Sequence, residues 1–129
     1  MHEVAEQVFR KGIAPQVSDE QLESLKTALV TDDHRLIQGC TTSPPDLMCV
    51  ADWPVESCCA ISWFAWQGEE MTVKEVGDKF GNYCYECDVL LSDPGCVRHF
   101  LNWFDDTPRN EMRAELAGLI ESILQERTK

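Results

Sequence analysis

The sequence predicts an all-α protein, an irregular multi-helix bundle of five to seven helices in a single helical domain over residues 1–129. Apolar residues recur every three or four positions in several segments, which is the spacing of one helix face. Two stretches, Ser18-Asp19-Glu20-Gln21 and Thr72-Val73-Lys74-Glu75, have the pattern of a capping box at a helix start. No segment combines strand-like alternation with hairpin turn residues. A chain of this length can form a core without a disulfide or a metal.

Two helices are expected before residue 31. A short N-terminal helix should end at Gly12 and Pro15, which are typical helix-stop residues. The first capping box then begins a helix over about 19–30. Its apolar residues share one face, which should pack on the core: Leu22, Leu25, Leu29 and Val30.

The stretch after this helix is predicted to be less regular. Asp32 and Asp33 stand where carboxylates cap a helix and interact with its dipole, so a further short helix is expected through Ile37. Residues 40–53 should be a turn or an extended segment, because each proline restricts its own backbone and that of its predecessor.

A buried apolar helix at about 54–66 is expected to be the centre of the bundle. Asp52-Trp53-Pro54 is typical of a helix start, since proline in the first turn lacks only an amide that has no partner there. The segment that follows is apolar on nearly every side, and a helix of that kind is buried. Gly68 should end it.

Three helices are expected in the second half. The second capping box begins a helix through Leu91, although Gly77 and Gly81 weaken it and a turn at 77–82 is the alternative. Ser92-Asp93-Pro94 is expected to begin the next helix, and Thr107-Pro108 the last.

The charge limits the possible partners. Net charge is −12, from 23 acidic and 11 basic residues, so we expect neither nucleic acid nor an anionic membrane as a partner. Residues 32–70 contain seven carboxylates and a single Lys or Arg, Arg35. Such a region is either a solvated surface or a contact face for a protein with a basic surface. The predicted interaction surface is Asp32, Asp33, Asp46, Asp52 and Trp53.

Four residues have the types and spacing of a structural zinc site: Cys84, Cys87, Cys96 and His99. The same positions lie on apolar helix stripes, so the favoured interpretation is buried thiols with no metal and no cofactor. Zinc is the alternative, and haem bound through His99 is a more remote one. Cys96 also lies near the N-terminus of a predicted helix, with Arg98 and His99 close in sequence, which makes a thiol enzyme or redox sensor a third hypothesis.

The favoured function is therefore a small, acidic, non-enzymatic module that binds another protein. A metal- or ligand-binding protein, using the four residues above or a pocket near Trp53, is the alternative. The phosphate-binding, dinucleotide-binding and serine-hydrolase motifs are absent from the sequence. The N-terminus lacks a basic region followed by an apolar run, so we expect a cytoplasmic protein with its seven cysteines reduced.

Overall fold

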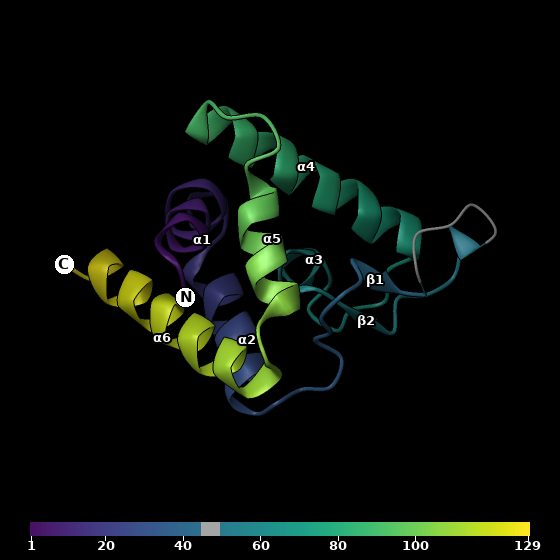
Figure 1. Cartoon of the computed structure of the whole chain (residues 1–129). Helices are drawn as coiled ribbons and strands as arrows, with labels where there is room; N and C mark the ends of the chain where they lie inside the picture. Colours follow the sequence, from purple (N-terminus) through teal and green to yellow (C-terminus); the bar gives the residue numbers. More distant parts are fainter. Residues whose placement is uncertain (45–49) are drawn as a thin grey trace.

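The computed structural model describes residues 1–44 and 50–129, and six α-helices dominate the described chain (Figure 1). The all-α prediction is confirmed, with the addition of a minimal antiparallel sheet that pairs Thr42 with Cys58 and Ser43 with Ser57. The elements are α1 (Glu3–Val8), α2 (Asp19–Val30), β1 (Thr42–Ser43), β2 (Ser57–Cys58), α3 (Ala60–Trp66), α4 (Val73–Leu91), α5 (Val97–Asp106) and α6 (Arg109–Arg127).

Both predicted capping boxes are formed. The Ser18 hydroxyl accepts a hydrogen bond from the Gln21 amide at 3.2 Å, and the Gln21 side chain accepts one from the Ser18 amide at 2.9 Å. Thr72 and Glu75 make the reciprocal pair at the start of α4, with distances of 3.1 and 3.2 Å. These bonds satisfy amide groups that a helix start leaves without a partner. The helix continues through Gly77 and Gly81, so the alternative turn there is wrong.

The N-terminal helix does not end at Gly12. It continues as a π-helical turn over Phe9–Ile13 and a 3₁₀ turn over Ala14–Gln16. Gly12 has a packing role instead, because a Cβ at this position would lie 2.5 Å from the Cys87 Sγ. The glycine thus allows α4 to pack against the π-helical turn.

The central helix is shorter than predicted. Only Ala60–Trp66 is helical, and residues 54–59 are extended. The backbone of this stretch bonds to distant segments: the Glu56 amide donates to the Ser43 carbonyl at 2.8 Å, and the Cys58 amide to the Arg35 carbonyl at 2.8 Å. These tertiary hydrogen bonds replace the local ones of a helix, and they outweigh the helix-start signal at Pro54.

Two further predicted helix starts are wrong. Residues 32–37 form a turn, in which Asp32 has a positive φ of 52° and Leu36 forms a bridge with Cys58. Residues 92–95 also form a turn, and α5 begins later, at Val97. In both places the expected capping residues lie in a loop. The first loop is held by its bridge to Cys58, and the second leads directly into α5.

The core is continuous across the helices. Phe9 contacts Phe100 and Phe64, with ring centroids 5.1 and 6.4 Å apart, so α3 and α5 meet at the π-helical turn. Figure 1 shows α4 across the top of the bundle, α5 descending from its end, and α6 along the lower side with α2. Six of the seven α3 residues are buried, which confirms the predicted central position of this segment. Among the helices described, none is long and apolar enough to cross a membrane.

Candidate functional site

Trp53 is the one tryptophan that lies on the surface. Its side chain is 56% exposed, whereas those of Trp63, Trp66 and Trp103 are at most 7% exposed. Large aromatic side chains normally bury most of their area. The exposed Trp53 indole therefore offers a large apolar contact area at the surface.

The backbone around Trp53 is held by hydrogen bonds to the start of α4. The Val73 amide donates to the Trp53 carbonyl at 2.8 Å, and the Lys74 amide donates to the Ala51 carbonyl at 3.0 Å. On the other side, the Val55 amide donates to the Met71 carbonyl at 2.9 Å. A contact residue on a fixed backbone loses little conformational entropy when it binds a partner.

An open pocket of about 230 Å³ lies beside Trp53. The residues on either side of Trp53 in the chain contribute to its wall, but the indole itself does not. Among the residues that the structure describes, the wall contains three carboxylates and no Lys or Arg. We call Trp53 and the pocket together the Trp53 surface; the pocket is lined by Asp52, Pro54, Glu70, Met71, Thr72 and Glu75.

The carboxylates of the Trp53 surface differ in their bonding. Glu75 is occupied, because it accepts hydrogen bonds from the Thr72 amide and hydroxyl at 3.2 and 3.1 Å. Asp52 and Glu70 are exposed, and neither makes an ion pair or side-chain hydrogen bond within residues 1–44 and 50–129. These two carboxylates are available for a cation from outside the chain.

Asp32 and Asp33 belong to a different arrangement. Arg109 donates to Asp32 at 2.8 Å, and Arg113 lies 3.5 Å from the same carboxylate. The hydrogen bond from Arg109 lowers the pKa of Asp32, and that from Arg35 lowers the pKa of Asp33. Both carboxylates are thus neutralised within the molecule. Asp46, the remaining predicted contact residue, lies outside the described residues.

Arg35 forms a contact that sequence reasoning missed. Its guanidinium lies 5.6 Å from the ring centroid of Trp63 and 5.6 Å from that of Trp66. The same group donates two hydrogen bonds to the Asp33 carboxylate, at 3.0 and 2.7 Å. The arrangement combines a cation–π contact with a two-pronged ion pair. The one sequence signal for this contact is that Arg35 is the single Lys or Arg in the acidic stretch 32–70.

The four residues of the alternative zinc site do not form one cluster among the described residues. The Sγ atoms of Cys87 and Cys96 are 3.6 Å apart and both residues are buried. Cys84 and His99 are only half-buried, and within the described residues neither side chain forms a hydrogen bond to this pair. No group of three or more His, Cys, Asp or Glu side chains in the described chain is placed to hold a metal ion. The structure therefore brings together two of the four residues.

The surroundings of Cys96 oppose an activated catalytic thiolate. Burial raises its pKa, and the nearby Asp88 and Asp93 raise it further, while the hydrogen bond to Cys87 acts in the other direction. Burial likewise raises the pKa of Cys87 to about 12. A reactive cysteine needs a stabilised thiolate and a base within reach. Neither condition is favoured by these contacts.

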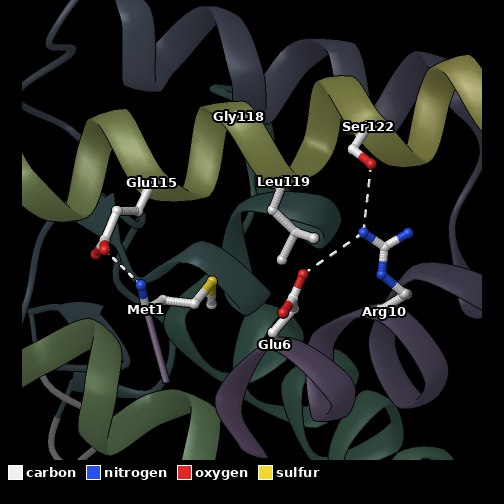
Figure 2. A pocket seen from close by; sticks show the side chains of 7 residues that line it. All are labelled: Met1, Glu6, Arg10, Glu115, Gly118, Leu119 and Ser122. Carbon is white, nitrogen blue, oxygen red and sulfur yellow. Dashed lines mark hydrogen bonds and ion pairs between the residues drawn. The ribbon is translucent and has the colours of Figure 1, made fainter. Parts of the chain in front are cut away.

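A second pocket, of about 310 Å³, lies between α1 and α6 and was not anticipated from the sequence. Figure 2 shows that its charged groups face one another: the Met1 ammonium bonds to Glu115, and Arg10 contacts Glu6 at 3.6 Å and Ser122 at 3.3 Å. These pairings join the N-terminal segment to α6. The pocket is therefore part of the packing interface between the N-terminal segment and α6, and the charged groups named here already have partners within the chain.

The chain matches no family model, and no curated protein or solved structure is significantly similar to it.

Proposed function

We propose that the protein is a small acidic interaction module that binds a basic segment of another protein through the Trp53 surface. The observation that carries this proposal is the exposed indole on a fixed backbone, together with two nearby pocket carboxylates that have no partner among residues 1–44 and 50–129. Tryptophan is among the residues that contribute most to protein–protein binding energy. The surface thus has an apolar anchor and the charge that positions a cationic partner.

Arginine or lysine is the partner chemistry that fits. A guanidinium or ammonium group forms cation–π contacts with an indole and ion pairs with carboxylates. The Trp53 surface offers both kinds of group, since Asp52 precedes Trp53 in the chain and lines the pocket together with Glu70. The net charge of −12 attracts a basic chain at long range and repels nucleic acid. The partner is accordingly a basic protein segment.

The alternative functions have less support. Zinc would need further ligands beside Cys87 and Cys96, and no third metal-binding side chain within the described chain completes that site. A thiol enzyme would need a stabilised thiolate at Cys96, where burial has the opposite effect. Haem bound through His99 has no supporting observation.

The test is a fluorescence titration with an arginine-containing basic peptide. Trp53 is the exposed fluorophore, so its emission should change saturably as the peptide binds, whereas an acidic peptide of equal length should have no effect. The Trp53→Phe variant keeps the three buried tryptophans and should lose this response. An equal response from Trp53→Phe would exclude the Trp53 surface as the contact.

The carboxylates need a separate test with a matched control. Asp52→Asn and Glu70→Gln each remove one unpaired charge and should weaken peptide binding about 2- to 5-fold, the effect of one exposed ion pair. Glu23→Gln removes an exposed charge on α2 and should leave affinity nearly unchanged. Equal weakening by all three variants would mean that the peptide responds only to total charge, and would exclude a specific site.

A further inference from the structure

Two buried thiols lie in contact at the junction of α4 and α5. Cys87 and Cys96 are 0% and 1% exposed, and their Sγ atoms are 3.6 Å apart. Cys87 lies near the end of α4 and Cys96 immediately precedes α5, in the upper part of Figure 1 where the chain turns from one helix into the next. The thiols therefore face each other across this turn.

The contacts around the pair fix both side chains. The Cys87 sulfur packs against Gly12, whose missing Cβ provides its space. The Cys96 sulfur lies 3.8 Å from the Cys87 carbonyl and 3.6 Å from an Asp88 carboxylate oxygen. Both thiols are thus oriented toward each other by the packing of α4 on the N-terminal segment.

We propose that Cys87 and Cys96 are an oxidation site, at which a small-molecule disulfide converts the two thiols into an intramolecular disulfide. The sulfurs need to approach by about 1.5 Å to reach bonding distance. Residues 92–95 of the intervening turn are exposed, so a small movement of this turn does not disturb buried side chains of the core. This inference is independent of the Trp53 surface.

The reaction proceeds in two exchanges. Burial keeps both thiols mainly protonated, so the exchange is slow at neutral pH and becomes faster as pH rises. The small thiolate fraction of Cys96, which borders the exposed turn, attacks one sulfur of the oxidant RSSR; a mixed disulfide forms, and one RS⁻ leaves and takes up the thiol proton. The Cys87 thiolate then attacks the Cys96 sulfur and displaces the second RS⁻, which is protonated in the same way. The protein loses two protons and two electrons, and the oxidant takes them up to become two RSH.

The other described thiols are less suited to the same reaction. Cys58 and Cys59 are neighbours in the chain, and Cys59 instead forms a hydrogen bond to the Ser62 hydroxyl at 3.5 Å. Cys84 lies one turn before Cys87 and is half-buried, with no hydrogen-bonded thiol partner in the described chain. Cys40 is exposed and can form a mixed disulfide with the oxidant, but no described thiol is in contact with it.

The test is treatment of the reduced full-length protein with oxidised glutathione, then alkylation of the remaining thiols and peptide mapping. We expect a peptide pair joined through Cys87 and Cys96, two fewer free thiols attributable to this pair, and reversal by dithiothreitol. Oxidised protein should also unfold at a higher temperature, since the cross-link restricts the unfolded chain. A principal cross-link between any other two cysteines, or none under conditions that modify Cys40, would overturn the proposal.

Serine variants make the assignment specific. Cys87→Ser and Cys96→Ser should each abolish the cross-linked peptide and leave the other thiol of the pair free to be alkylated. Cys84→Ser, one helical turn away on α4, should form the linkage as the parent does. Since the peptide map of the parent protein alone identifies the bonded pair, a variant that folds poorly does not affect the conclusion.

Discussion

In the described part of the chain, two regions that combine tryptophan with carboxylates differ in one respect: one contains an arginine and the other does not. In the first, the Arg35 guanidinium lies over Trp63 and Trp66 and bonds to Asp33. In the second, Trp53 is exposed and its carboxylate neighbours have no cation in the pocket wall. The first region is a structural contact, because the chain itself provides the arginine. The second region has the same kinds of group at the surface without an arginine in the pocket wall described.

The first region indicates how the second can bind. In the first region a single arginine contacts two indoles and one carboxylate. Its flat guanidinium lies over the rings of Trp63 and Trp66 and donates two hydrogen bonds to Asp33. Since the Trp53 surface offers an indole and carboxylates without the arginine, a partner arginine is expected to complete it in the same way. The carboxylates of one acidic stretch thus differ: Asp32 and Asp33 are paired with arginines, whereas Asp52 and Glu70 have no partner among the described residues.

The largest expected effect is the contrast between the two kinds of tryptophan. Trp63→Ala should lower the free energy of unfolding by about 3–5 kcal/mol, because it leaves a cavity and removes the indole hydrogen bond to Ser24. Trp53→Ala should change it by no more than about 0.5 kcal/mol, since the side chain is mainly in solvent. Urea denaturation measures both values. A loss of more than about 2 kcal/mol in Trp53→Ala would mean that Trp53 is structural after all.

The next effect concerns the arginine itself. Arg35→Met keeps much of the side-chain length but loses the charge, and should destabilise the protein by about 1–2 kcal/mol through the lost stacking and ion pair. Arg35→Lys keeps the charge without the flat fork, so its stability in urea should lie between the parent and Arg35→Met. If Arg35→Lys equals Arg35→Met, charge has no part in this contact.

A smaller effect is expected in partner selection. If the Trp53 surface accepts an arginine as Trp63 and Trp66 do, an arginine-rich peptide should bind about 2- to 5-fold more tightly than its lysine-rich counterpart of equal charge, a difference of about 0.5–1 kcal/mol. Isothermal titration calorimetry with both peptides measures the ratio. Equal affinities, also in Trp53→Phe, would show that only charge is recognised.

The helices could be predicted from the sequence because their signals are local. The capping boxes at Ser18 and Thr72 each involve residues three apart, so a few side chains determine the start of α2 and of α4. The predicted central helix was wrong at its beginning because the amides of Glu56 and Cys58 bond to residues 13 and 23 positions earlier in the chain, Ser43 and Arg35. Nothing in the local pattern indicates those partners.

The candidate site was predictable in part for the same reason. The exposure of Trp53 was suggested by its place beside a proline in an irregular segment, and the structure places it at the surface. The neutralisation of Asp32 depends on Arg109 and Arg113, which are far away in sequence and come next to it only when α6 packs against α2. Composition identified the acidic stretch but not which of its carboxylates lack a partner.

The smallest expected effect is an acid dependence that only the completed contact has. The hydrogen bonds from Arg35 lower the pKa of Asp33 in the folded protein below the ordinary value of 3.8. As pH falls, the unfolded chain therefore takes up this proton first, and the stability that the pair contributes above pH 3.8 is lost as pH falls toward the lower folded-state pKa. Asp33→Asn removes this contribution, so the stability difference from the parent in urea should be present at neutral pH and shrink in acid. Arg35→Met should likewise lose less stability than the parent as pH falls, because the hydrogen bonds that lower the pKa of Asp33 are gone. A difference between parent and Asp33→Asn that is constant with pH would mean that the hydrogen bonds hold the loop without favouring the charged carboxylate.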